Sequence, residues 1–267
     1  MFVGPRRWGY VGATLVPAVR IQLCGRLALE LDERRVDQEL PGRQGRLLFV
    51  FLVVHRLRPV RRDELIDALW PRLPPAAADT ALRALISKLR RLLPNMLDGR
   101  AELRLSLPPD AFIDLEDARE AIHRAESALA QGQWHRAWGA SLSPLFTARR
   151  GFLPDEDAEW IRDTRQELEE LYLRALECYA QACLGVGGTE LAGAERSARE
   201  LTRLAPYRES GYRQLMRALA RSGNTAEALR VYERLRTLLR EELGIVPSTE
   251  TLELHASLLS DRAPAAN

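Results

Sequence analysis

Two neighbouring helical patterns, separated by prolines, constrain this chain more than any other segment. The stretch from Arg62 to Leu93 reads RDELIDALWPRLPPAAADTALRALISKLRRLL. In its second half, apolar residues recur every three or four positions, so that they form one stripe that must be buried. The members of this stripe are Leu82, Leu85, Ile86, Leu89, Leu92 and Leu93. A supporting helix followed by a helix with one apolar and one basic side is typical of a pair that reads DNA, and a solvated surface helix is the plain alternative.

The side opposite the stripe is small in the middle and polar around it. Thr80, Ala84, Ser87 and Arg91 follow one line along the expected helix. Such a surface suits the major groove of DNA, where bulky side chains would clash. The pattern therefore favours a groove-facing role for this side of the helix.

Charge is divided unevenly between the two parts of the chain. The whole chain has 39 basic and 37 acidic residues, a nearly neutral balance that predicts no partner. From Ala18 to Ile113 there are 17 basic and 12 acidic residues, net +5, whereas from Asp114 onward there are 20 and 25, net −5. A basic first part and an acidic second part fit a nucleic-acid-binding domain followed by a domain with another kind of partner. Lys88 is the only lysine, which indicates a genomic bias toward arginine, so arginine counts alone do not indicate DNA contacts.

Composition favours a folded cytoplasmic protein without a cofactor or metal. The run from Leu47 to Val54 stops well short of the roughly 18 apolar residues that a membrane helix needs. Cys24, Cys178 and Cys183 have no metal-ligand spacing and lie in apolar surroundings, as buried thiols do in a reducing compartment. No membrane partner is expected.

The order of the expected elements indicates two domains. Alternating apolar residues predict short antiparallel strands near 19–23 and 27–31, and an Asp98-Gly99 turn predicts a hairpin over 97–107. Helices are expected over 42–54 and 62–69, with residues 59–60 as a connector, before the helix that carries the stripe. These elements make a winged helix-turn-helix, an α+β domain, over 18–113. Residues 1–17 are expected to be a disordered leader and 261–267 a flexible tail.

The second domain, 114–260, reads as all-α and tetratricopeptide-like. Gly132 with Ala137, and Gly223 with Ala228, share a glycine followed five residues later by an alanine, a pattern of small residues where two helices cross closely. Helical pairs are expected at about 114–148, 155–204 and 206–243, the last closed by residues 241–247, and would stack into an α-solenoid. The fold class is therefore mainly α, a winged helix followed by a helical repeat domain.

Particular segments carry a resemblance to a known family. Residues 19–93 resemble the OmpR-type DNA-binding domain of the Streptomyces antibiotic regulatory proteins, notably in RDELIDALW at 62–70 and ISKLRRLL at 86–93. From Asp114 onward the chain resembles the bacterial transcriptional activator domain of that family, most clearly at 152–176 and 204–252. The resemblance implies a transcriptional activator that binds double-stranded DNA at direct repeats near a promoter and contacts RNA polymerase, as a homodimer or by tandem binding on DNA.

Candidate DNA contacts fall into two groups. Ser87 and Lys88 match the places where the family has its polar and basic groove residues, and Thr80 and Arg83 lie nearer the N-terminal end of the same helix, so these four are expected to read bases. Cations expected to hold phosphate are placed at the start of the second helix, at the end of the reading helix and at the hairpin tip. These are Arg61 and Arg62, Arg90 and Arg91, and Arg100, of which Arg100 is expected to enter the minor groove and Arg90 has an intramolecular ion pair as an equal alternative.

The same sequence supports other functions less well. The four histidines are scattered, and the acidic residues at 155–159 are expected to open a long helix and balance its dipole, so an enzyme is not expected. Trp134, Trp138 and Trp160 are interpreted as packing residues and not as a ligand site. The serious alternative is a helical-repeat scaffold whose winged helix binds protein, and a repressor using the same DNA contacts also stays open.

Overall fold

The computed structural model describes residues 18–71 and 75–260. Its internal contacts divide them into two units. The first contains residues 18–22 and 27–113, and the second contains residues 114–260 together with the short segment Leu23–Arg26. The boundary between the two units falls between residues 113 and 114, and the assignment of Leu23–Arg26 to the second unit was not expected. The predicted leader at 1–17 and tail at 261–267 lie outside the described residues.

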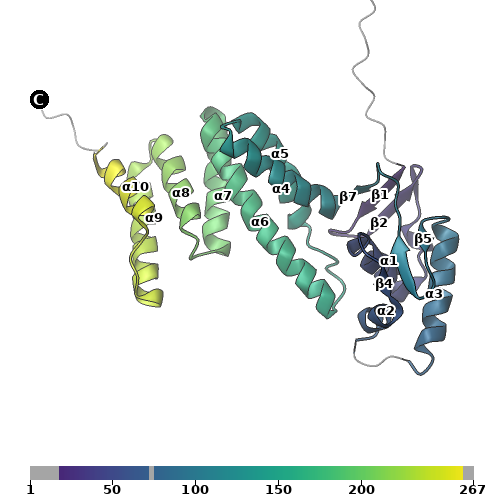
Figure 1. Cartoon of the computed structure of the whole chain (residues 1–267). Helices are drawn as coiled ribbons and strands as arrows, with labels where there is room; N and C mark the ends of the chain where they lie inside the picture. Colours follow the sequence, from purple (N-terminus) through teal and green to yellow (C-terminus); the bar gives the residue numbers. More distant parts are fainter. Residues whose placement is uncertain (1–17, 72–74, 261–267) are drawn as a thin grey trace, which may run out of the picture. The chain divides into compact units, whose positions relative to one another are not determined.

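A small sheet opens the first unit (Figure 1). Its strands are β1 (Val19–Gln22), β2 (Ala28–Leu31), β3 (Arg34–Arg35) and β7 (Phe112–Ile113), in the order β3-β2-β1-β7. β1 pairs antiparallel with β2, where Ile21 lies opposite Leu29 and both are buried. The predicted antiparallel strands are therefore confirmed, whereas β7 adds a parallel partner that its two residues did not reveal.

Three helices and a hairpin complete this unit. A short 3-10 turn (Asp37–Glu39) precedes α1 (Gly42–Val54), which is followed by α2 (Arg62–Leu69) and α3 (Ala78–Leu92). β5 (Leu97–Asp98) and β6 (Glu102–Leu105) form the predicted hairpin, here called the wing. β4 (Val60–Arg61) pairs with β6, so part of the expected connector is a strand. A strand of only two residues forms because a distant segment pairs with it, so the sequence of β4 shows no alternation that would predict a strand.

The apolar stripe of α3 packs inward, with four of its six residues buried and Leu85 and Leu92 half-buried. Leu82 and Leu89 are fully buried and Ile86 is 3% exposed. α1 supplies much of the facing core, because Leu48, Phe49 and Leu52 are also fully buried. Burial of one face of α3 fixes which side chains lie on its outer face. The winged-helix prediction is confirmed.

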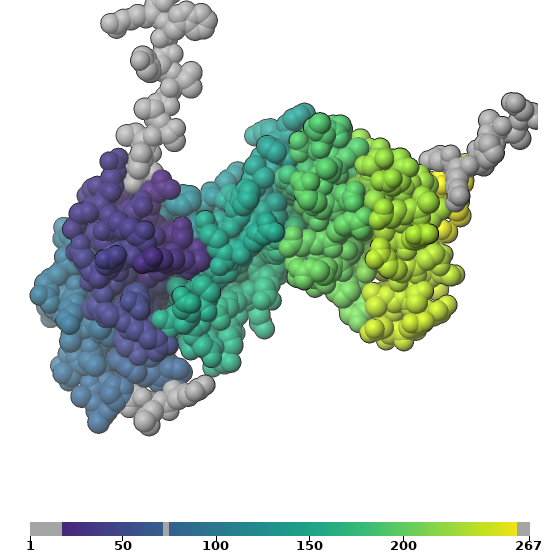
Figure 2. All heavy atoms as spheres, turned by 180° about the vertical axis from the view of Figure 1, so that it is seen from behind, coloured from purple at the N-terminus to yellow at the C-terminus, as the bar shows by residue number. Residues whose placement is uncertain are grey.

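The second unit is a row of helices. They are α4 (Asp114–Ala130), α5 (Trp134–Arg149), α6 (Glu159–Val186), α7 (Leu191–Leu204), α8 (Glu209–Arg221), α9 (Thr225–Leu238) and α10 (Thr249–Ser260), with a 3-10 turn at Gly188–Glu190 and a π turn at Leu239–Leu243. Each helix from α4 to α9 packs against the next along the chain, and side chains fill the space between them (Figure 2). The three predicted helical pairs are confirmed. α10 is an additional helix, packed on α8 and α9, that the sequence reading missed.

The glycine and alanine pattern has a different cause from the one expected. Gly132 and Gly223 lie in turns with φ of 67° and 83°, a left-handed conformation that favours glycine. Ala137 and Ala228, five residues later, are fully buried in the helix contacts. The glycines therefore serve the turns between paired helices, and only the alanines mark close packing.

Helix α6 begins later than its acidic residues suggested. Asp155, Glu156 and Asp157 precede its first residue, Glu159. The guanidinium of Arg165 donates to the backbone carbonyls of Phe152 and Glu156, which holds this segment in an irregular conformation. Only Glu159 lies in the first turn of the helix, so the predicted interaction of the whole acidic set with the helix dipole is wrong.

The three tryptophans of this unit all pack against other residues, as interpreted from the sequence, and Trp134 also lines a surface groove. Trp138 packs among apolar residues, and its indole N–H donates to Glu190 over 3.1 Å. The ring of Trp160 meets that of Phe152 edge to face, with centroids 6.2 Å apart. Trp134 packs against the backbone of α6 at Gly185, where a Cβ atom would lie 2.1 Å from the indole ring.

A buried carboxylate ties the segment Leu23–Arg26 to the rest of the second unit. Asp114, 3% exposed, accepts hydrogen bonds from the backbone N–H groups of Leu23 and Cys24 over 2.8 and 3.1 Å. Arg150 adds an ion pair at 3.1 Å. Burial raises the pKa of the Asp114 carboxyl, and the hydrogen bonds and Arg150 only partly offset that effect.

Candidate nucleic-acid interface

The outer face of α3 presents the predicted base-reading residues. Thr80, Arg83, Ser87 and Lys88 are all exposed, and so is the small residue Ala84 between them. Their positions follow from the burial of the opposite face, because residues three and four apart share one side of a helix. The structure therefore places these four side chains on one accessible surface.

Asp79 holds two of the candidate arginines at the N-terminal end of α3. Its carboxylate lies 3.3 Å from Arg62 Nη2 and 3.5 Å from Arg83 Nη2. Arg62, with a side chain that is 24% exposed, also donates to the carbonyl of Arg100 in the wing over 3.5 Å. One carboxylate faces two guanidinium groups, so this cluster keeps a net positive charge.

Arg61 has a carboxylate partner of its own, whereas Arg62 and Arg83 share one. The Arg61 guanidinium contacts Asp63 through two hydrogen bonds, of 3.2 and 2.6 Å. Glu64 accepts the backbone N–H of Arg61, and Asp63 accepts that of Glu64. The backbone amides at the start of α2, which could otherwise receive a phosphate group, are thus partly occupied by the chain's own carboxylates.

Arg90 joins α3 to the wing. Its guanidinium donates to the carbonyl of Leu97 over 3.3 Å and to the carbonyl of Gly99. Gly99 has a φ of 92°, and a Cβ atom there would lie 1.8 Å from the carbonyl oxygen of Glu102. Arg90 therefore contacts the tight turn of the wing through backbone carbonyls, and the structure shows no ion pair for it among the described residues.

A groove between α3 and the wing gathers most of the candidates. It is lined by Arg62, Arg83, Ile86, Ser87, Arg90, Arg91, Arg100, Ala101 and Leu103. Five of these are arginines and none is acidic. Arg91 and Arg100 are exposed, and their guanidinium groups have no ion-pair or hydrogen-bond partner within the part of the chain that is described. Thr80, Lys88 and Arg61 do not line this groove.

Sequence reasoning missed one residue that shapes this surface, Asp79, and the role of another, Arg90. Asp79 was not singled out, although an acidic residue in the first turn of a basic helix is a recognisable signal. The role of Arg90 as a contact of the wing backbone had no signal, because its partners are carbonyls seven and nine residues away. Asp79 fixes the positions of Arg62 and Arg83, and the wing carbonyls fix that of Arg90.

Residues 18–71 and 75–260 contain neither a metal-binding cluster nor a candidate membrane helix. No group of three histidine, cysteine or carboxylate side chains in these segments could hold a metal ion. None of the helices found there combines the length and the apolar character needed to cross a membrane.

The known proteins and the protein family that this chain resembles are all transcriptional or regulatory proteins by name. Residues 113–259 match the family described as the bacterial transcriptional activator domain. The transcriptional regulatory protein EmbR of Mycobacterium tuberculosis is 30% identical over 256 residues, which cover 92% of this chain and 65% of EmbR. The regulatory protein DnrI of Streptomyces peucetius is 32% identical over 244 residues, covering 82% of this chain and 85% of DnrI.

A solved structure shows the same fold. It is that of Mycobacterium tuberculosis EmbR in complex with a low affinity phosphopeptide, with a TM-score of 0.77 and 27% identity. The match covers 93% of this chain and 67% of that one. The matched family model alone spans more than half of the chain. The chain therefore belongs to the bacterial transcriptional activator domain family, and among its members to the transcriptional regulators of the Streptomyces antibiotic regulatory protein type.

Proposed function

We propose that this chain regulates transcription by binding specific DNA sequences, with α3 in the major groove and the wing at the adjacent minor groove. The observation that carries the proposal is the groove between α3 and the wing, whose lining includes five arginines and no acidic residue, although two of the arginines, Arg62 and Arg83, share the carboxylate of Asp79. Arginine-lined surfaces beside a helix with small, polar outer residues suit a phosphate backbone flanking a major groove.

The candidate residues take different parts in this proposal. Thr80, Arg83, Ser87 and Lys88 would contact bases, since they lie on the exposed face of α3. Five arginines would face phosphate or the minor groove, to different extents: Arg61, Arg62, Arg90, Arg91 and Arg100. The unpartnered guanidinium groups of Arg91 and Arg100 would contribute most. Arg62 and Arg90 would chiefly position the wing through its carbonyls, and Arg61, paired with Asp63, would contribute least.

In this proposal the chain activates transcription by binding directly repeated sites near a promoter. The second unit would contact RNA polymerase or a second copy of the chain, because its row of helices offers a large surface that DNA binding does not use. Such a protein would work in the cytoplasm, at the nucleoid. A repressor would need the same DNA contacts, so a promoter assay is needed to separate the two.

The scaffold alternative is less well supported. A protein-docking helix should expose large apolar side chains, yet among the described residues none of the exposed large apolar side chains lies on α3. The outer face carries Arg83, Lys88 and Arg91 instead. These side chains favour nucleic acid over a protein partner.

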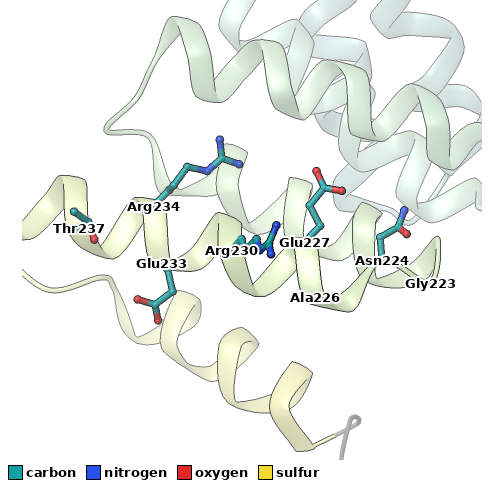
Figure 3. Close-up of a pocket in the computed structure, with 8 residues that line it drawn as sticks. All are labelled: Gly223, Asn224, Ala226, Glu227, Arg230, Glu233, Arg234 and Thr237. Carbon is teal, nitrogen blue, oxygen red and sulfur yellow. The ribbon is translucent and has the colours of Figure 1, made fainter.

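The test is selection of genomic fragments by the purified chain, followed by gel shifts of the selected DNA at low and physiological salt. We expect a directly repeated motif with half-sites about one or two helical turns apart, near 10–10.5 bp each. Lys88→Ala should reduce discrimination against mismatched sites by about 1–3 kcal/mol. Arg230→Ala, which removes an exposed cation on α9 in the second unit (Figure 3), is the matched control and should bind as the wild type does.

The proposal has a clear negative outcome. If binding is salt-sensitive but shows no preferred sequence, and Lys88→Ala matches the wild type, α3 does not read DNA in this protein. The scaffold reading would then take its place.

A further inference from the structure

A second polar groove lies wholly within the second unit, between α6 and α8. Its walls include three arginines of α8, at four-residue intervals: Arg213, Arg217 and Arg221. Residues four apart share one face of a helix, so all three side chains belong to the same side of α8. Trp134 of α5 and Gln214 of α8 also line the groove.

The charges of this groove are only partly compensated. Arg213 pairs with Glu250 over 2.9 Å, and Glu177 pairs with Arg208 over 3.7 Å. Arg221 donates to the backbone carbonyl of Leu184, which leaves its charge without a counter-ion. Arg217 is exposed and has no partner among the described residues. Arg217 and Arg221 therefore have no carboxylate partner among the described residues, and they favour an anionic ligand.

The acidic residues of the lining narrow the chemistry of that ligand. Glu177 and Glu250 line the groove together with the three arginines, so the lining has a net charge of +1. A continuous phosphate backbone would be repelled by the two carboxylates, whereas an extended peptide can place carboxylates against the arginines and backbone N–H groups against the glutamates. The groove is therefore better matched to an acidic peptide than to nucleic acid.

The spacing of the cations agrees with an extended peptide. Arg217 and Arg221 are four residues apart, which corresponds to about 6 Å along a helix axis. Side chains at alternate positions of an extended strand are about 6.5 Å apart. Trp134, held against α6 at Gly185, supplies an aromatic surface beside the charged positions.

We propose that this groove binds an extended acidic segment of a partner protein. Carboxylates at alternate positions of that segment pair with Arg217 and Arg221. The inference goes beyond DNA binding and does not depend on it, because every residue that carries it lies in the second unit.

The test uses the tryptophan indole N–H signals of the full chain in nuclear magnetic resonance. The chain has five tryptophans, and Trp134→Phe identifies the signal from the groove. The probe is a blocked seven-residue peptide of alternating alanine and glutamate, titrated to millimolar concentration. We expect the Trp134 signal to move progressively while that of Trp160 stays in place. The same peptide with glutamine in place of glutamate should bind at least about tenfold more weakly, because charge-assisted hydrogen bonds are lost.

Single variants locate the binding site. Arg217→Ala removes an exposed, unpartnered side chain, so it should leave the fold intact and weaken binding of the glutamate peptide about tenfold. Arg230→Ala removes an arginine on α9 outside the groove and should not change binding (Figure 3). The proposal is wrong if the Trp134 signal does not move, or if the glutamine peptide or Arg217→Ala gives the same titration.

Two further outcomes would also overturn it. If the peptide binds through the arginines near α3, Arg91→Ala will abolish binding and Arg217→Ala will not. If a short single-stranded oligonucleotide moves the Trp134 signal at lower concentration than the peptide does, the groove takes nucleic acid.

Discussion

Replacing Arg91 and Arg100 together by alanine should weaken DNA binding much more at low salt than at high salt. Both guanidinium groups line the groove between α3 and the wing, without an internal partner among the described residues. Each is therefore free to neutralise a phosphate and release a condensed counter-ion. Arg61, by contrast, is paired with Asp63 through two hydrogen bonds.

The size of the effect follows from the number of unpaired cations. One phosphate contact contributes about 0.9 to the slope of log affinity against log salt concentration, so the double variant should lose about 1.8. Between roughly 50 and 200 mM salt, the affinity advantage of the wild type should then shrink about tenfold. Removing Arg61 and Asp63 together deletes a neutral pair and should leave the slope unchanged.

Fluorescence anisotropy of a labelled operator fragment, measured over a salt series, gives these slopes directly. Circular dichroism should first show that both double variants keep the wild-type helix content. Equal losses of slope in the two double variants would refute the reasoning, since internal pairing would then have no bearing on which arginine meets phosphate.

Three other predictions concern stability and the wing. Leu89→Ala removes a fully buried side chain and should lower the free energy of unfolding, measured in urea, by about 2–5 kcal/mol. The neighbouring Lys88→Ala should change this free energy by no more than about 0.5 kcal/mol. Similar values for both variants would contradict the burial pattern of α3. Gly99→Ala places a Cβ atom 1.8 Å from the carbonyl oxygen of Glu102, so it should lower the free energy of unfolding by about 1–3 kcal/mol and weaken operator binding. An unchanged melting temperature would count against this turn geometry. Burial raises the pKa of Glu209, but hydrogen bonds from the segment that begins α10 outweigh burial and hold it below its usual range. The stability from these bonds is therefore present above the unfolded pKa of about 4.5 and is lost as the pH falls through the folded pKa. The difference in the free energy of unfolding between wild type and Glu209→Gln should accordingly shrink from pH 7 to about pH 3. A constant difference would show that these hydrogen bonds are not the source of the stability.

Periodicity and turn chemistry were enough to predict most helices and the exposed face of α3. The apolar stripe that includes Leu82 and Leu89 determines both which side is buried and which residues lie outside. The Asp98-Gly99 dipeptide likewise marked the wing turn, because a residue with positive φ is needed there. Local patterns of this kind depend only on neighbours in sequence.

The remaining features depend on partners far along the chain. β4 exists because β6 pairs with it across 43 positions, as in Val60 with Leu103, and α10 is held by two earlier helices. In the candidate site, the sequence listed the cations but not which of them are occupied. Asp79 and the carbonyls contacted by Arg90 decide that, and neither contact follows from a period of 3.6 or 2.

The assignment of Leu23–Arg26 to the second unit determines how well the two units can be separated by truncating the chain. The chain leaves the first unit after β1, contributes four residues to the second, and returns to form β2. A fragment that starts at Asp114 would therefore begin with a buried carboxylate deprived of both backbone N–H partners. We expect such a fragment to fold less stably than the same segment within the full chain, so the two units are better separated by substitutions in their surfaces than by truncation.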